Sequence, residues 1–305
     1  MADLFSLDGS GATRQLLAQS IAGAVNNTDC YCDAWYTSLG DDWLFTFGNV
    51  MTWIVFALSI LVLVFYVWHS FHATTGWEEC YVAVIELGMA CLELYTEFYT
   101  PFTLFLSNGN IVAWLRYAEW LMSCPVILIH MANLTGLNNS YSPRTMSLLI
   151  SDVGCIVLGS TAAMATGWVK WVFFCMALSF GLTTYYNAAR VYMEAFHTVP
   201  KGICRQLVMA LAWIYFTSWS CFPILFILGP EGLDHIPFMA SSVAHNFLDL
   251  ISKNLWGMLA HMLRVKIHEH ILIHGDIRTK TKVSVAGQDV EVETFVEPGT
   301  VEDAV

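Results

Sequence analysis

The sequence predicts an all-α membrane protein with seven transmembrane helices and a short β-hairpin near its C-terminus. Hydrophobic residues make up 56% of the 305 residues and charged residues only 12%, about half the charged share of an average soluble domain. The apolar residues fall into long blocks separated by polar breaks. Each block approaches the ~20 residues that cross ~30 Å of hydrocarbon, which excludes an ordinary soluble fold.

Polar, glycine-rich and proline-rich breaks separate the seven blocks. The expected spans are 50–70, 77–105, 111–134, 145–166, 168–196, 206–228 and 238–263, the last with a helical extension to His270. Beyond Lys280, apolar and polar residues alternate on both sides of Gly287, which predicts the hairpin. We therefore divide the chain into an N-terminal segment (1–45), a seven-helix domain (46–270) and a C-terminal segment with the hairpin and an acidic tail (271–305).

Basic residues indicate the orientation of the chain. Most lie in the third–fourth loop, in the fifth–sixth loop and after the seventh span, which share one side of the membrane. Because cytoplasmic loops carry the excess of lysine and arginine, the N-terminus is predicted outside the cell. The net charge of −12 and the absence of a basic run argue against a nucleic-acid partner.

The seventh span contains Asp249 and Lys253, four residues apart. This spacing places them one turn apart on one face of a helix. Ionisable residues inside a span cost roughly 2.5–3.5 kcal/mol each on insertion scales and are functional candidates by default. One interpretation is a buried ion pair that holds the bundle together. The other is a lysine that forms an imine with a carbonyl ligand, with Asp249 as part of its counterion.

Two further carboxylates interrupt the third and fourth spans. Glu119, which follows Arg116 in the third span, needs a cation, and Lys253 can supply it. Asp152 is alone in the fourth span, so Cys124 or a water is its candidate partner. A purely structural bond between the two helices is the alternative.

A stripe of glutamates runs along the second span. Glu79, Glu86 and Glu93 are seven residues apart and Glu97 lies four beyond, so they share one side of a helix. Glu78 precedes them. Such a stripe favours a wetted path for cations. Protonated glutamates hydrogen-bonded to other helices are the alternative for one or two of them.

Several long motifs resemble the green-algal cation channelrhodopsins, a branch of the microbial rhodopsins. The resemblance covers about residues 30–296. It includes Gly76-Trp77-Glu78-Glu79, Arg116-Tyr117-Ala118-Glu119-Trp120-Leu121, Cys124-Pro125-Val126-Ile127-Leu128-Ile129-His130, Ser151-Asp152-Val153-Gly154, His197-Thr198-Val199-Pro200-Lys201-Gly202, Gly229-Pro230-Glu231-Gly232, Asp249 through Asn254, and Ile267-His268-Glu269-His270-Ile271.

The resemblance implies a microbial-rhodopsin bundle that carries all-trans retinal as a protonated Schiff base on Lys253. Glu119 and Asp249 match the counterions of the family, and Cys124 and Asp152 match the pair that sets the closing speed of the pore. Further positions expected to contact retinal are Trp120, Cys124, Cys155, Trp219 and Phe222.

The resemblance also assigns residues to three parts of a pore and to a subunit contact. The central gate is expected at Ser59, Glu86 and Asn254. The inner gate is expected at Tyr66, Glu78, Glu79, His130 and Arg264, and the outer vestibule at Glu93, Glu97 and Arg116. Cys30 and Cys32 match cysteines that bridge the two subunits of a homodimer, and their extracellular placement permits disulfides.

The resemblance implies a light-gated channel for protons, sodium and other cations, in contact with membrane lipid and without enzymatic activity. We expect no catalytic residues and no metal site. The expected location is the plasma membrane, in the eyespot region. Met89 stands where several relatives have a lysine, and Cys155 where they often have threonine.

A light-driven proton pump, a light-gated anion channel and a sensory receptor are the alternatives on the same fold. His130 occupies the position where a pump needs a carboxylate proton donor, and the second-span glutamates repel anions. A receptor without retinal would leave Lys253 and its two carboxylates unexplained.

Overall fold

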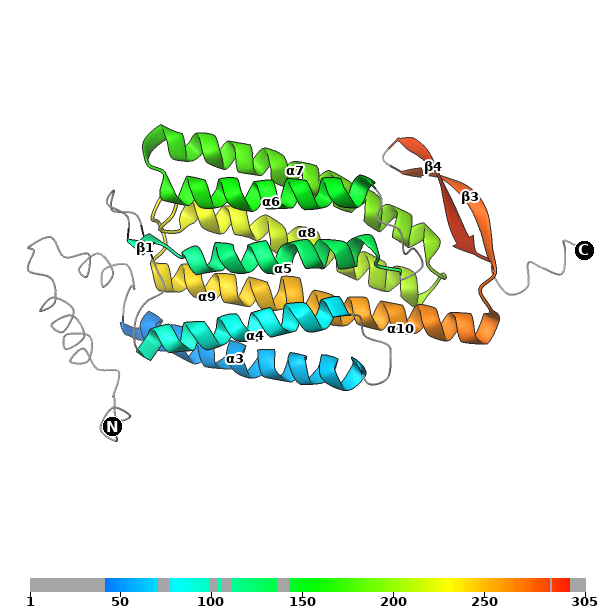
Figure 1. Cartoon of the computed structure of the whole chain (residues 1–305), viewed down its shortest axis with the longest axis horizontal. Coiled ribbons are helices and arrows are strands. Elements are labelled where there is room, and N and C mark those ends of the chain that lie inside the picture. Colours follow the sequence, from blue (N-terminus) through cyan, green and yellow to red (C-terminus); the bar gives the residue numbers. More distant parts are fainter. Residues whose placement is uncertain are drawn as a thin grey trace, which may run out of the picture.

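The computed structural model describes residues 42–70, 77–98, 104–105, 111–135, 143–285 and 287–296. In this part of the chain seven long helical rods run side by side, as Figure 1 shows. The first six are α3 (Asp42–Ser70), α4 (Trp77–Phe98), α5 (Trp114–Ala132), α6 (Pro143–Met164), α7 (Gly167–Thr198) and α8 (Ile203–Leu228). The seventh is continuous through α9 (Phe238–Asp249), the π-helix η2 (Leu250–Leu255) and α10 (Trp256–His274). The predicted bundle of seven helices is thus confirmed.

Several of the predicted boundaries are wrong: the first span begins at Asp42 and not at residue 50, and the sixth begins at Ile203 and not at residue 206. The second span was expected to reach Phe105, but α4 ends at Phe98 and the strand β1 (Leu104–Phe105) pairs antiparallel with β2 (Ile111–Val112). Consequently the third span begins at Trp114 instead of Ile111. Pro101 in the sequence explains the early end of α4, because proline disfavours helix at the residue before it and has no N–H to continue the ladder.

The seventh rod contains the largest local departure from α-helix. Residues Leu250–Leu255 form a π-helical turn, and Lys253 lies inside it. Single π turns within α-helices occur frequently at functional sites. Beyond this turn α10 extends to His274, one turn past the predicted end, and reaches the C-terminal hairpin (Figure 1).

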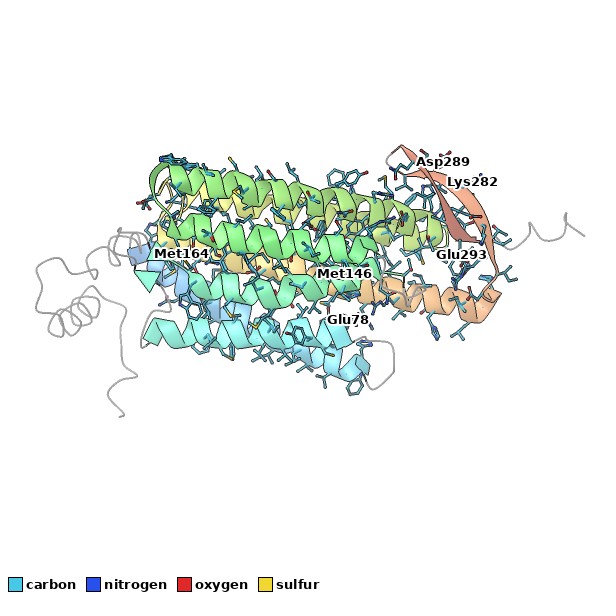
Figure 2. The ribbon with its side chains drawn as sticks, turned by 45° about the horizontal axis from the view of Figure 1, so that its top comes forward. Glu78, Met146, Met164, Lys282, Asp289 and Glu293 are labelled. Atoms are coloured by element: carbon cyan, nitrogen blue, oxygen red, sulfur yellow. The ribbon has the colours of Figure 1, made fainter. Side chains whose placement is uncertain are left out.

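The outer surface of the bundle is apolar. Leu61, Ile150 and Trp213 are 64%, 62% and 75% exposed, and Met146 and Met164 lie near the two ends of α6 on its outer surface (Figure 2). Four of the described helices, α3, α6, α7 and α8, are long and apolar enough to cross a membrane. The other three rods carry Glu86, Glu119, Asp249 and Lys253, whereas Asp152 lies on α6. An apolar exterior around ionisable residues is the arrangement expected of a multi-pass membrane protein.

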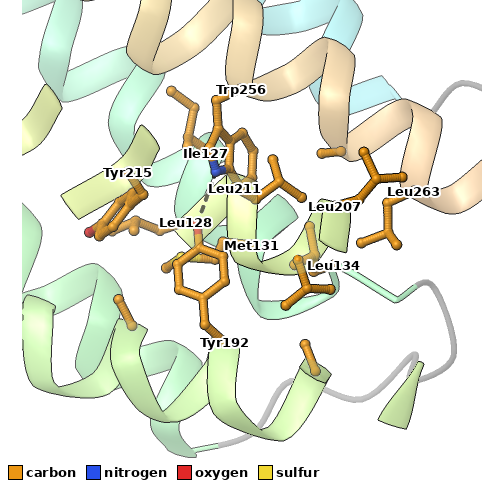
Figure 3. Close-up of a cluster of buried hydrophobic side chains, with 14 of the residues drawn as sticks. Ile127, Leu128, Met131, Leu134, Tyr192, Leu207, Leu211, Tyr215, Trp256 and Leu263 are labelled. Carbon is orange, nitrogen blue, oxygen red and sulfur yellow. Dashed lines mark hydrogen bonds between the residues drawn. The ribbon is translucent and has the colours of Figure 1, made fainter. Parts of the chain in front are cut away.

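The largest buried apolar cluster fills the half of the bundle nearest the hairpin. Trp256 of α10 is 1% exposed, and its indole N–H donates to the hydroxyl of Tyr192 on α7 at 2.9 Å, drawn as a dashed line in Figure 3. Leu128 and Leu211, both fully buried, surround this bond. This tightly packed half fixes the rods against one another, so that the polar side chains between them are held in defined positions.

The predicted hairpin is present as β3 (Arg278–Val285) and β4 (Gln288–Phe295). Val283 faces Val290 across the strands, and Lys280 faces Glu293. Gly287 in the turn has φ of +77°, which favours glycine. Val285 is fully buried where the hairpin contacts α7, whereas Lys282, Asp289 and Glu293 are exposed (Figure 2).

Candidate functional site

Three helical rods bring a carboxylate to the amine of Lys253. Lys253 is 3% exposed, and its Nζ lies 2.9 Å from Asp249 Oδ1 and 2.9 Å from Glu86 Oε1. It also donates to Glu119 Oε1. Glu119 is oriented by the hydroxyl of Ser123, one turn later on α5, which donates to it at 2.9 Å. The structure therefore places both predicted counterions, Glu119 and Asp249, beside Lys253.

Glu86 was predicted at the central gate and not as a direct partner of the lysine. Its carboxylate comes from α4, while Glu119 comes from α5 and Asp249 from the seventh rod. A buried cation thus joins three rods, and three carboxylates surround one positive charge. Such an arrangement is stable only if some of the negative charge is neutralised by protons or by other partners.

An apolar cavity of about 330 Å³ extends from Lys253 between the rods. Its walls include Trp120 of α5 and Phe222 of α8, whose ring centroids are 5.0 Å apart in an edge-to-face arrangement. All the positions predicted to contact retinal line it: Trp120, Cys124, Cys155, Trp219, Phe222 and Lys253. The structure therefore gathers that predicted set around one cavity.

The predicted gating pair also faces this cavity. Cys124 comes from α5 and Asp152 from α6, and both are buried. In the described part of the chain, no protein group donates to Asp152 Oδ2. The structure brings the two residues to the same cavity wall without a direct hydrogen bond between them, so their coupling through a water stays a prediction.

The three residues predicted for the central gate are all buried. Ser59 on α3, Glu86 on α4 and Asn254 on η2 are 2%, 8% and 4% exposed. The π-helix contacts both α3 and α4 at this level. Among the described residues, Ser59 Oγ and Asn254 Nδ2 have no protein hydrogen-bond partner. Buried polar atoms without a protein hydrogen-bond partner mark a place where water or an ion is accommodated.

The residues predicted for the inner gate lie in one polar cluster, in which Glu79 and Arg264 form an ion pair. Glu79 Oε1 lies 3.2 Å from Arg264 Nη1 and 3.4 Å from His130 Nε2, so α4, α5 and α10 meet there. Tyr66, Glu78, Glu79 and His130 line a second cavity, of about 10 Å³, that also touches Lys253 and Asn254. This space is close to the volume of one water probe. This polar cluster therefore leaves room for about one water at the end of the bundle nearest the hairpin.

The opposite end is described only in part. Arg116 Nη2 donates to Ser242 Oγ at 3.5 Å, linking α5 to α9. The side chains of Glu93 and Glu97 lie outside the described residues, and so do Cys30 and Cys32. The predicted outer vestibule is thus placed only at Arg116, and the predicted disulfides remain predictions.

Several residues of the site were not predicted. Tyr117, Tyr185, Ser220, Glu231 and His245 also line the large cavity. The Tyr117 hydroxyl donates to Glu231 Oε2 at 2.6 Å, and Lys170 Nζ donates to the Glu231 carbonyl at 2.6 Å. Glu231 thereby connects the ends of α5 and α7 to the loop after α8. The sequence offered one signal, the acidic residue in the Gly229-Pro230-Glu231-Gly232 loop. An acidic side chain in a loop is usually exposed to solvent, so this signal did not indicate a buried site.

Comparison with known proteins decides the family. The model of the family described as "Bacteriorhodopsin-like protein" matches residues 46–267. The chain belongs to this family of microbial rhodopsins. This rhodopsin is similar to the red light-activated channelrhodopsin Chrimson, with 49% identity, a TM-score of 0.82, and coverage of 89% of this chain and 94% of Chrimson.

Curated relatives include light-driven pumps at lower identity. Halorhodopsin of Halobacterium sp. (strain SG1) is 24% identical over 220 residues, which cover 68% of this chain and 75% of that protein. Bacteriorhodopsin-II of Haloarcula marismortui is 28% identical over 189 residues, covering 60% and 74%. A solved halorhodopsin described as a light-driven chloride pump matches with 19% identity and a TM-score of 0.59, which shows the fold alone.

The residues present fit the retinal chromophore that the family implies. The cavity volume of about 330 Å³ is within the range of small-molecule sites, its walls are mostly apolar, and Lys253 supplies a buried primary amine at one end. When bound, retinal supplies visible-light absorption and a change of shape on isomerisation. Lys253 would hold it covalently, and the aromatic walls would restrict its orientation.

Proposed function

We propose that this rhodopsin is a light-gated cation channel, opened by photoisomerisation of all-trans retinal on Lys253. The contact between Glu86 and Lys253 carries the proposal, because it joins the chromophore lysine to the glutamate stripe of α4. The similarity to Chrimson, a protein described as a channelrhodopsin, supports it.

The polar side chains define a route along the bundle. It passes the cluster at Glu79 and the buried group at Glu86, and then the charges around Lys253. Closing at the Glu79 end is attributed to the ion pair with Arg264, which has to separate before a hydrated ion passes. Because the acidic side chains on this route outnumber the basic ones, cations are favoured over anions.

Within the site, each chain residue has a distinct role. Asp249 and Glu119 stabilise positive charge at Lys253 Nζ, and Glu86 does so from the pore side. If the positive charge at Lys253 Nζ is lost or moves, its attraction for the Glu86 carboxylate weakens. The Glu86 side chain can then turn toward Ser59 and Asn254. Through this coupling, a change of charge at Lys253 would alter the side-chain positions at the central gate.

The remaining finer assignments are part of the same proposal. The excess of basic residues in the loops expected to be cytoplasmic supports an extracellular N-terminus. The resemblance to green-algal channelrhodopsins supports the plasma membrane of the eyespot region. Cys30 and Cys32 would link two chains into a homodimer. The chain then consists of an extracellular segment, the seven-helix channel and a C-terminal segment that includes the hairpin, without an enzymatic activity.

A light-driven pump is the second candidate, favoured by the halorhodopsin and bacteriorhodopsin relatives. A proton pump needs a carboxylate donor on the far side of the lysine. The cluster there contains Glu79, but this carboxylate is ion-paired with Arg264. An ion-paired acid is a poor proton donor, so this observation favours the channel.

Whole-cell recording separates these functions. Cells that express the chain with all-trans retinal are illuminated while the voltage is stepped in solutions of two sodium, two proton and two chloride concentrations. We expect a photocurrent whose reversal voltage follows sodium and protons. A current of constant sign at every voltage would establish a pump, and a reversal that follows chloride would establish an anion channel. Either result overturns the proposal.

A further inference from the structure

The last turns of α10 carry a pair of histidines that the function above does not use. His270 and His274 lie at the C-terminal end of α10, where His270 contacts Phe295 of the hairpin. Their spacing of four residues places both rings on one face of the helix. Two histidines with this spacing on one helical face are a recurring zinc-binding arrangement.

The geometry of the two rings suits a shared metal ion. Their centroids are 4.8 Å apart and their planes are inclined by 50°. Two imidazoles that bind one tetrahedral ion at a metal–nitrogen distance of about 2.0 Å have their ring centres about 5 Å apart. The observed separation of the two ring centres matches this value. His274 is exposed and His270 partly so, which leaves an entry path from water.

The electrostatic surroundings also permit a cation. The nearby basic side chains are paired with acids, Lys266 Nζ with Glu269 Oε2 at 2.7 Å and Arg278 Nε with Asp276 Oδ1 at 2.5 Å.

The number of available ligands limits the kind of site. Among the described residues, no group of three or more histidine, cysteine, aspartate or glutamate side chains is placed to hold a metal. A metal at this pair would have two protein ligands, with water in the remaining positions. Such a site is reversible and responds to the free metal concentration, unlike the closed four-ligand sites that hold structural zinc.

The pair is connected to the hairpin through an aromatic contact. The ring of His270 meets Phe295 of β4 edge-on, with centroids 5.3 Å apart, and Arg278 stacks over the same phenylalanine at 5.3 Å. A ligand that fixes the His270 ring would also fix the surface on which Phe295 packs. Occupancy of the site would therefore stabilise the docking of the hairpin on α10.

We propose that His270 and His274 form a binding site for a transition-metal dication of the Zn²⁺, Ni²⁺ or Cu²⁺ class. Imidazole nitrogens suit these ions and not Mg²⁺ or Ca²⁺, which prefer oxygen ligands. The site lies at the end of the bundle that carries the hairpin, separate from the cluster at Glu79. It does not depend on whether the protein is a channel or a pump.

Equilibrium dialysis against ZnCl₂ tests the site. The full retinal-loaded chain is purified without a polyhistidine tag, and bound zinc is measured for the original protein and for the variants His270→Gln, His274→Gln and the double variant. We expect one zinc per chain that each single variant binds at least tenfold more weakly and that the double variant loses. His268→Gln, an exposed histidine on the same helix, is the matched control and should bind zinc like the original chain.

A second measurement distinguishes coordination from a structural role of the rings. His270→Phe keeps a ring against Phe295 but has no ligand nitrogen, so it should fold with unchanged visible absorption and bind zinc as weakly as His270→Gln. Cu²⁺ bound to the original chain should show hyperfine coupling to two imidazole nitrogens in its electron paramagnetic resonance spectrum. Zinc retained by the double variant, or copper without two nitrogen ligands, overturns the proposal.

Discussion

Glu86 Oε1 lies 2.9 Å from Lys253 Nζ, so a residue of the α4 stripe is a direct partner of the lysine that we propose holds retinal. In many buried ion pairs the acid and the base interact only with each other. Here the same acid is also predicted at the central gate with Ser59 and Asn254, whose Oγ and Nδ2 atoms have no protein partner among the described residues. The position of Glu86 therefore depends on the charge at Lys253.

Replacing Glu86 by glutamine tests this relationship. At an effective dielectric constant of about 20, a carboxylate about 4 Å from a cation stabilises it by about 4 kcal/mol. Less negative charge beside Nζ stabilises the positive charge of the ground state less, so we expect absorption at longer wavelength. We also expect the photocurrent to lose selectivity for cations over anions.

The measurements are the visible spectrum and the reversal voltage of the photocurrent. Glu269→Gln is the matched control, because this glutamate is exposed and paired with Lys266 at 2.7 Å, away from the site. If Glu86→Gln leaves both the spectrum and the selectivity unchanged, the Glu86 carboxylate does not stabilise the positive charge at Lys253.

Replacing Lys253 by alanine removes the amine that holds retinal. We expect a colourless protein without photocurrent, and reduced thermal stability, since Glu86, Glu119 and Asp249 would lose the cation that they share. Absorption and current are measured after addition of retinal, with the exposed Lys201→Ala as control. Visible absorption that survives in Lys253→Ala would contradict the assignment of the chromophore lysine.

The pair between Arg264 and Glu79 permits a double-mutant cycle. The Glu79 side chain is fully buried and that of Arg264 is 16% exposed, and removing one partner of a buried pair costs about 3–5 kcal/mol. We expect Arg264→Gln to melt at a lower temperature and to pass more current in the dark. Glu79→Gln in the same chain should restore part of the stability, because no unpaired carboxylate then remains.

The melting temperature is followed by the loss of visible absorption in the two single variants and the double variant. Arg144→Gln, at the partly exposed pair with Glu194 (2.5 Å) that joins α6 to α7, is the control. It should lower stability without a dark current. Strictly additive effects of the two substitutions at Glu79 and Arg264 would show that the pair does not act as a unit.

The sequence was sufficient to predict the elements whose signal is local. The seven spans follow from apolar length, and the contact between Asp249 and Lys253 follows from a spacing of four residues. The end of α4 was misplaced because apolar residues continue after Pro101 and hide the break. The strand pair β1–β2 is only two residues long on each side, too short for a recognisable alternation.

The contacts between side chains of different rods could not be predicted from local sequence patterns. Whether Glu86 points at Lys253 or past it depends on the rotation of α4 about its axis and on its distance from the seventh rod, which packing determines. The same holds for Glu231, whose bond to Tyr117 joins residues 114 positions apart. The spacing of His270 and His274 was visible in the sequence, but the proximity of Phe295 required the fold.

A last prediction concerns the packing of α6 on α7, where Gly154 lies against Phe180. A Cβ atom at Gly154 would stand 2.7 Å from Cδ1 of the Phe180 ring, closer than carbon atoms approach one another. Gly154→Ala should therefore destabilise the protein by about 1–3 kcal/mol through overpacking. Because Asp152 precedes Gly154 by two residues, a displaced α6 should also change the rate at which the photocurrent decays.

Gly88→Ala is the matched control, since a Cβ atom there meets no other atom within 4 Å. In the interior of a helix this change should stabilise by about 0.5–1 kcal/mol. The two variants are compared by melting temperature and by photocurrent decay after a flash. A second substitution, Phe180→Leu, should relieve the clash and recover part of the loss in Gly154→Ala. If Gly154→Ala instead melts like Gly88→Ala, then α6 and α7 adjust at this contact, and Gly154 does not determine their separation.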